Sequence, residues 1–360
     1  MSPRRRPRPC GNYSASRPHT PPDLPANSPI HVITAAALLG AIAVLLAWPV
    51  PLVLARSAWP ARSPAVALVL WQAIALSGGM SMIGSLLVYG LVPFGDALPQ
   101  SIAALGGDLR AGTLPTGTTF THVLALGAAV LLGTHLLLNL LATFVRAERQ
   151  RRRHHALITL LSDPLRGQPG MRVIDHPAPV AYCLPRVGHS ATVLSNGLLR
   201  LLDADQVRAV IAHEQAHLVQ QHHLVLLAFK SWHSALPWFP IANRAENAVA
   251  LLVEMLADDH ARRVVDDYTL ARAIALVAFA LVGSSPPLKR EADAAARAVA
   301  SASRSGRAHA ADPEHPSDQV APRVSRLVNP IVPLGYVATA GTLAVSAVLL
   351  AGPALILFAA

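Results

Sequence analysis

The residues best suited to chemistry lie in one short stretch, His213-Glu214-Gln215-Ala216-His217. Residues four apart on an α-helix lie about 40° apart around its axis, so His213 and His217 can offer two imidazoles to one cation. Glu214 follows the first histidine, where its carboxylate can take a proton from a water molecule beside that cation. An H-E-x-x-H pattern on a helix therefore predicts a zinc site that carries its own general base.

The plainer interpretation is a helix whose two histidines and glutamate bond to neighbours and carry no chemistry. Against it, Glu214 lies close in sequence to Ile211, Ala212 and Leu218. A buried carboxylate without a partner costs several kcal/mol. A bound zinc ion supplies the partner, and this favours the metal site.

A helix that positions the motif is predicted within 203–223. Asp203 can cap its first turn, with Gln206 as the reciprocal partner in a capping box. Apolar residues at helical spacing follow at Val207, Val210, Ile211 and Leu218.

A third ligand is predicted on a second helix, over 242–265. Glu254 is an isolated acid on an otherwise apolar face, where a further metal ligand would lie. A carboxylate paired with an arginine is the alternative. Asp258 lies one turn later and can fix the tautomer of a ligating imidazole by accepting its hydrogen bond. We expect Asp259 and His260 to be solvated.

Composition bounds the class of protein. The chain has 360 residues, of which 52% are hydrophobic and only 14% charged, and the apolar residues are clustered. That is too apolar for an ordinary soluble enzyme. The net charge of +10 comes from arginine clusters. Beside apolar runs these favour an anionic lipid surface, and we expect no direct nucleic-acid binding. Cys10 and Cys183 fit neither a disulfide framework nor a metal knuckle, which is compatible with a reducing compartment.

Four long apolar runs predict four membrane-spanning helices, at 30–48, 65–92, 121–145 and 336–358. Gly78, Gly79 and Gly84 interrupt the second run and indicate close helix packing. The third run ends in an arginine cluster at 146–153, on the same side as Arg56 and Arg62 if the spans alternate. This charge pattern predicts a multi-pass plasma-membrane protein whose region 146–334 is cytoplasmic. The N-terminal arginines argue for the opposite orientation, but only Arg17 lies near the first span.

Short strands are predicted at 171–175, 180–183 and 191–195, after a helix at 154–161 that can continue the third span. We expect Asn196-Gly197 to form the turn that leads to the motif helix. A strand beside a zinc helix can pair with an extended substrate, although plain core structure is an equal alternative for each strand.

An apolar helix is predicted at 224–235, ended by Pro237 and Pro240. Lys230, Trp232 and Trp238 suggest that it lies against the membrane surface; a buried core helix is the alternative. His222, His223 and His233 are expected at packing or surface positions rather than as ligands.

The predicted fold is mainly α, with a four-helix transmembrane region and a cytosolic α+β zinc-peptidase domain. The predicted segments are a disordered arm (1–28), three transmembrane helices (29–145), the peptidase domain (146–283), a flexible insertion with a short helix at 289–300 (284–322), a connector (323–333) and the fourth transmembrane helix (334–360).

Two stretches, 193–227 and LLVEMLADDHA at 251–261, resemble the membrane metallopeptidases of the BlaR/MecR type, the zinc-peptidase part of β-lactam-responsive regulators. The resemblance covers about 172–262, and three spans before the catalytic part with one after it fit the same plan. The HtpX/Ste24-type peptidases share the HExxH and ExxxD pattern more distantly. The stretch PRVSRL at 322–327 is weakly similar to a basic segment of their catalytic domains.

This resemblance implies a gluzincin-like site in which His213, His217 and Glu254 bind Zn²⁺. Glu214 would be the general base, and Asp258 would hold a ligand. It also implies a protein substrate in the cytosol, often a transcriptional repressor. Proteins of the BlaR/MecR type carry a penicillin-binding sensor after the fourth span. This chain ends at Ala360, so we expect no antibiotic sensing through such a domain.

Three functions remain in view: a BlaR/MecR-like protease that acts on a cytosolic regulator, an HtpX/Ste24-like protease that processes or clears membrane proteins, and a non-enzymatic membrane signalling protein with a relic site. The substrate distinguishes the first two, and the phenotype of Glu214→Gln tests the third. Candidates for an additional donor to the oxyanion are Arg323, Arg326 and His260.

Overall fold

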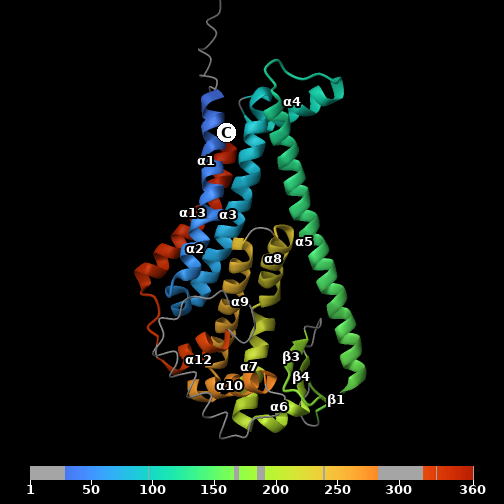
Figure 1. Cartoon of the computed structure of the whole chain (residues 1–360), viewed down its shortest axis with the longest axis vertical. Helices are drawn as coiled ribbons and strands as arrows, with labels where there is room; N and C mark the ends of the chain where they lie inside the picture. The colour runs from blue at the N-terminus through green and yellow to red at the C-terminus, as the bar shows by residue number, and fades with distance from the viewer. Residues whose placement is uncertain are drawn as a thin grey trace, which may run out of the picture.

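The computed structural model describes residues 29–95, 97–165, 170–184, 191–237, 240–282, 319–329 and 331–359. The molecule is elongated. Long apolar helices fill one end and the middle, and a small sheet with shorter helices forms the other end (Figure 1). The predicted arm at 1–28 and the predicted helix at 289–300 lie outside the described residues.

Four helical stretches are long and apolar enough to cross a membrane: Ile30–Arg56, Pro64–Phe94, Phe120–Ile158 and Tyr336–Ala359. By length and composition, the prediction of four spans is confirmed. The first consists of α1 (Pro29–Ala47) and α2 (Pro49–Arg56). Pro49 is the first residue of α2, where a backbone N–H would have no acceptor within the helix, so proline is tolerated there. The second consists of α3 (Pro64–Leu91) and the short helix η2 (Val92–Phe94). The other two are α5 (Phe120–Leu161) and α13 (Tyr336–Ala359).

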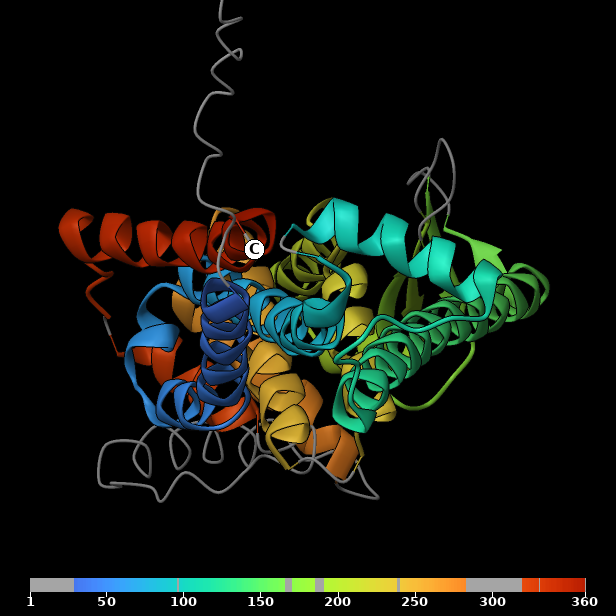
Figure 2. The ribbon, with the colours of Figure 1, turned by 90° about the horizontal axis from the view of Figure 1, so that it is seen from above.

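Helix α3 is the centre of this bundle and packs against α1, α5 and α13. Small residues permit the close approach that the sequence predicted. A Cβ on Gly84 would lie 3.0 Å from Leu357 of α13, and one on Gly79 would lie 3.0 Å from the ring of Trp232. Helix α5 diverges from α3 towards the end that carries the sheet, and α13 lies obliquely across the bundle (Figures 1 and 2). The short helix η1 (Trp59–Arg62) joins the first two spans, and α4 (Leu98–Ala111) lies at the far end.

Helix α5 continues without a break to Leu161, so the predicted helix at 154–161 is part of it. Directly after α5 a four-stranded sheet begins. Its order is β1-β2-β4-β3, from β1 (Ser162–Pro164), β2 (Met171–Ile174), β4 (Ala191–Ser195) and β3 (Ala181–Leu184). Strands β2 and β4 are parallel, and the other pairs are antiparallel. The three predicted strands are confirmed to within one residue at each end, and β1 was not predicted. Strand β3 lies at an edge of the sheet, which leaves one of its sides without a paired strand among the described residues.

The predicted turn at Asn196-Gly197 is wrong. Ser195 caps a helix there, α6 (Asn196–Leu201), by accepting the N–H of Leu198. Gly197 is required for a close approach: a Cβ on it would lie 2.0 Å from the carbonyl oxygen of Pro177. A tertiary contact, not a local turn, therefore explains this glycine.

The motif helix is α7 (Ala204–Val219), and its predicted capping box is confirmed. The Gln206 N–H donates to Asp203 at 2.9 Å, and the Asp203 N–H donates to Gln206 at 3.1 Å. The helix does not continue to 223. Gln221 adopts a left-handed conformation with φ of 50°, and α8 (His222–Ala235) starts in a new direction.

The remaining helices are α9 (Pro240–Ala261), α10 (Asp267–Val282) and α12 (Val320–Val328). Helices α8 and α9 extend from the end that carries the sheet into the space between α3 and α5 (Figure 1). Val249 and Val253 of α9 are fully buried in one core cluster with Trp71 of α3. Helix α9 and the candidate spans therefore share a hydrophobic core.

Helix α8 packs inside this bundle rather than along its surface. His135 of α5 contacts the carbonyl of Ala235 at 3.1 Å, and the Asn139 amide donates to the carbonyl of Ser231 at 2.6 Å. Trp232 lies against Gly79, although Lys230 is exposed. These contacts favour the core-helix alternative for 224–235, and Trp238 lies outside the described residues.

Candidate metal centre and active site

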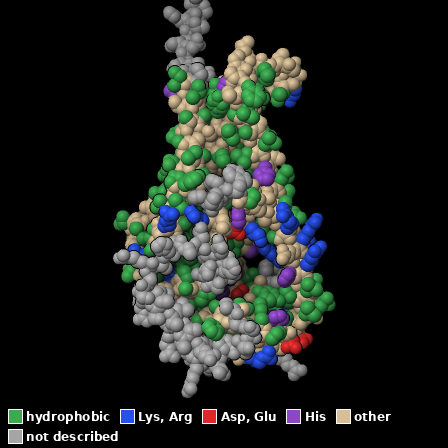
Figure 3. All heavy atoms as spheres, in the orientation of Figure 1, with side chains coloured by type: hydrophobic (Ala, Val, Ile, Leu, Met, Phe, Trp, Pro, Cys, Tyr) green, Lys and Arg blue, Asp and Glu red, His purple; other side chains and the backbone are tan. Residues whose placement is uncertain are grey.

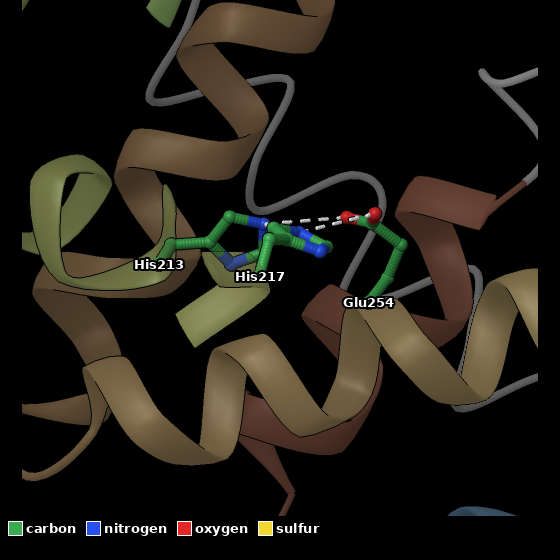
Figure 4. A group of neighbouring side chains, drawn as sticks. All are labelled: His213, His217 and Glu254. Atoms are coloured by element: carbon green, nitrogen blue, oxygen red, sulfur yellow. Dashed lines mark hydrogen bonds and ion pairs between the residues drawn. The ribbon is translucent and has the colours of Figure 1, made fainter. Parts of the chain in front are cut away.

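Two helices bring three of the predicted site residues together. His213 and His217 project from α7, and Glu254 projects from α9 towards both (Figure 4). The two Nε2 atoms lie 3.2 Å apart. The Glu254 carboxylate oxygens lie 3.3 Å from Nε2 of His213 and 3.5 Å from Nε2 of His217. One donor atom from each residue lies within 4.8 Å of the other two.

This spacing fits a zinc ion. Nitrogen and oxygen ligands lie about 2.0–2.2 Å from Zn²⁺ in tetrahedral sites, so two such ligands are roughly 3.3 Å apart. The two Nε2 atoms are 3.2 Å apart, Oε2 of Glu254 lies 3.3 Å from His213 and Oε1 lies 3.5 Å from His217, and each distance is close to that value. Two imidazoles and one carboxylate also leave a fourth position open, as catalytic zinc sites do.

Asp258 lies behind His213. Its Oδ1 is 3.0 Å from Nδ1 of His213, although that nitrogen does not point along a good hydrogen-bond direction. Asp258 is only 1% exposed. A carboxylate on the Nδ1 side favours the proton there and leaves Nε2 available to a cation.

His222 contacts the Nδ1 side of His217, as Asp258 contacts the Nδ1 side of His213. It is 2% exposed, and its Nδ1 lies 3.0 Å from Nδ1 of His217. Its Nε2 lies 2.9 Å from Oε1 of Gln220, an acceptor, so Nε2 carries the proton. Nδ1 of His222 then accepts from Nδ1–H of His217, which leaves Nε2 of His217 free to ligate. The sequence indicated a packing or surface histidine, and its contact with His217 arises from the left-handed turn at Gln221.

The other two histidines of that group lie away from the three donors. His223 is half-buried, and His233 pairs with Glu246 at 2.7 Å between α8 and α9.

The two carboxylates beside His213 favour positive charge on its imidazole. Burial lowers the pKa of His213, but the neighbouring Asp258 and Glu254 outweigh burial and raise it to about 9. For His217 burial prevails and lowers the pKa to about 4. Burial raises the pKa values of Glu254 and Asp258, but contacts with His213 and Arg323 bring both down to about 2. Both carboxylates are therefore ionised at neutral pH.

Glu214 lines the same cavity as His213 and Glu254. Burial raises its pKa to about 7, against the positive charges of His213 and Arg323 and a hydrogen bond with the backbone of Cys183. A carboxyl group that titrates near neutrality can both accept and return a proton, which is what a general base and acid must do.

Arg323 of α12 was a candidate oxyanion donor, and the structure brings it to the site. Its guanidinium donates to both oxygens of Asp258, at 2.7 and 2.8 Å, and lies 2.8 Å from Glu254. It thus holds the two carboxylates in place. The carboxylate–arginine pair that was the alternative for Glu254 is thus present, beside the two histidines. No local pattern indicated Arg323 as the partner, because 65 residues separate it from Asp258.

Arg326, the second candidate donor, lies outside the site. It donates to both oxygens of Asp259, at 2.7 and 2.8 Å, and to the carbonyl of Ala61 in η1 at 2.7 Å. The expectation that Asp259 is merely solvated is therefore wrong. His260, the third candidate, is half-buried and does not line the cavity beside the donors.

Comparison with protein families agrees with this geometry. The family model of peptidase family M48 matches residues 145–312. The match covers just under half of the chain and includes His213, Glu214, His217 and Glu254. It supports a membrane-associated metallopeptidase, and it does not distinguish the BlaR/MecR type from the HtpX/Ste24 type. No solved structure matches the chain.

Proposed function

We propose that this protein is an integral-membrane zinc endopeptidase. The observation that carries the proposal is the set of three donor residues on α7 and α9, whose nearest nitrogen and oxygen atoms lie 3.2–3.5 Å apart, with Glu214 beside them. The M48 match over the same residues supports it.

The chemistry divides among a few side chains. A zinc ion at His213, His217 and Glu254 would polarise a carbonyl and lower the pKa of water. Glu214 takes the proton from the attacking water and returns it to the leaving amine. Asp258 and His222 hold the two imidazoles in the tautomers that ligation requires. Arg323 offsets the negative charge of the acids and fixes their positions.

The substrate binds as an extended segment along β3. This edge strand has one side free among the described residues, and it lies beside α7. Its Cys183 backbone bonds Glu214, so a peptide paired with β3 passes close to the general base. Main-chain hydrogen bonds of this kind hold a peptide whatever its sequence.

The substrate we favour is a cytosolic regulatory protein, as in the BlaR/MecR resemblance. Support comes from charge: Lys and Arg side chains gather at one level, between the apolar spans and the catalytic end (Figure 3). By the positive-inside rule, that end faces the cytoplasm of the cell membrane. A transcriptional repressor is then a reachable substrate.

A second candidate is an HtpX/Ste24-like protease that processes membrane proteins. The position of α8 and α9 between the spans α3 and α5 favours it, because the site is then close to the bilayer surface (Figure 1). A non-enzymatic protein with a relic site remains the alternative that activity measurements address.

The test is the Glu214→Gln variant. We expect it to retain zinc, measured by elemental analysis of the purified protein, and to lose peptide cleavage. Substrates trapped on this variant in cells and identified by mass spectrometry would separate a soluble regulator from a membrane protein. Bound zinc with unchanged cleavage would remove Glu214 from its role.

A further inference from the structure

A cavity of about 610 Å³ opens beside the three donors. Its titratable lining residues, His213, Glu214, Glu254 and Arg323, all belong to the site, and its other lining residues are apolar. The space-filling view shows a hollow in this end of the molecule, with hydrophobic, acidic, basic and histidine side chains around it (Figure 3).

One face of α10 forms half of the apolar wall. Leu270, Ala273, Ile274, Val277, Ala278 and Leu281 follow one another at the three- and four-residue spacing that lines a single helical face. Val180 and Ala181, at the start of the edge strand, lie on the cavity as well. A peptide along β3 would thus pass between the donors and this wall.

The residues that line the cavity favour a large apolar substrate side chain over a small or a charged one. A volume of 610 Å³ lies within the range of ligand pockets, roughly 300–1,000 Å³, and holds far more than a methyl group. Glu254 already has Arg323 as its counter-charge. A basic side chain would therefore have to compete for it. An acidic one would meet Glu214 and Glu254, and would have to compete with Asp258 and Glu254 for Arg323. A large apolar side chain needs no partner.

We propose that this cavity is the specificity pocket of the protease, and that cleavage occurs next to a large apolar residue such as Leu, Phe or Met. The inference rests on the proposed function, because it assigns the pocket to a substrate side chain beside the scissile bond.

Cleavage of a peptide library by the full-length protein, mapped by mass spectrometry, tests the preference. We expect peptides with a large apolar residue on one side of the scissile bond to be cleaved about 10–200-fold faster than those with alanine or aspartate there. Ala278→Phe, and in parallel Val277→Phe, should fill the cavity and shift the preference towards small residues. Ala280→Phe is the matched control, because it lies on α10 but does not line the cavity.

A binding measurement separates the pocket from the activity. Calorimetry on zinc-loaded Glu214→Gln would compare hydroxamates that carry a methyl group with hydroxamates that carry a benzyl group. We expect at least tenfold tighter binding of the benzyl compound, and loss of that difference in a double variant with Ala278→Phe. If this difference is seen but wild-type protein cleaves nothing, the proposed function fails and the pocket stands. Equal affinities, or cleavage without an apolar preference, would overturn the pocket, and absence of all hydroxamate binding would overturn both.

Discussion

Asp258 and Asp259 are neighbours in sequence but differ in their surroundings, and this makes a sharp test of the site. Asp258 is 1% exposed and contacts His213 and both guanidinium nitrogens of Arg323 that point at it. Asp259 binds Arg326 on another side of α9, away from the donors. Asp258→Asn should therefore impair zinc binding, whereas Asp259→Asn should not.

The magnitude follows from these contacts. Removing the carboxylate that orients a ligating histidine typically costs 10–100-fold in metal affinity, or about 1.4–2.7 kcal/mol. Breaking one partner of a buried ion pair costs about 3–5 kcal/mol of folding stability. In Asp258→Asn, Arg323 keeps Glu254 as a second partner. We therefore expect this variant to lose folding stability at or below the lower end of that roughly 3–5 kcal/mol range. The Asp259 side chain is 30% exposed, and Arg326 keeps the carbonyl of Ala61 as a second partner, so we expect Asp259→Asn to cost less stability than Asp258→Asn.

The assay is a zinc titration against a chelating dye for wild type and both variants in the same detergent, with thermal unfolding of the metal-free proteins alongside. We expect weakened zinc binding in Asp258→Asn alone, and a smaller loss of stability in Asp259→Asn. If the two variants bind zinc equally well, the role that we assign to Asp258 is wrong.

His222→Ala should weaken zinc binding about tenfold, because Nδ1 of His217 loses its partner, whereas the half-buried His223→Ala should match wild type in the same titration. Zinc affinity should rise with pH, by up to about tenfold per unit below pH 9, because the cation must displace the proton that His213 holds with a pKa of about 9 in the metal-free protein; a flat profile between pH 6 and 8 would contradict this. Gly197→Ala should destabilise the fold by roughly 1–3 kcal/mol in denaturant unfolding, because its Cβ would meet a backbone carbonyl at 2.0 Å. Gly106→Ala, which meets nothing within 4 Å, is the control, and equal stability of the two variants would refute the close approach at Gly197.

Features with a local cause were predictable from the sequence. The capping box at Asp203 and Gln206 depends on two residues within one helical turn, and it formed as predicted. The four spans follow from run length and composition alone. The convergence of His213 and His217 follows from helix geometry, because their spacing places both on one face.

Features that depend on distant packing were not predictable. Asn196-Gly197 has the composition of a turn. Gly197 is instead needed because the backbone carbonyl of Pro177 lies too close to leave room for a Cβ. His222 reaches His217 only because Gln221 reverses the local path, and no periodicity indicates that bend. Arg323 meets Asp258 across a long separation in sequence, which no local pattern encodes.

The short helix α12 has a mechanical consequence. Its nine residues carry Arg323 and Arg326 on successive turns. Arg323 forms ion pairs with Asp258 and Glu254. Arg326 binds Asp259 and the carbonyl of Ala61, which lies in the link between the first two candidate spans. A helix of nine residues is too short to bend appreciably. Helix α12 therefore connects the link between the first two candidate spans to Glu254 through two guanidinium groups, and a shift of that link relative to α9 would strain the contacts of Arg326 or of Arg323.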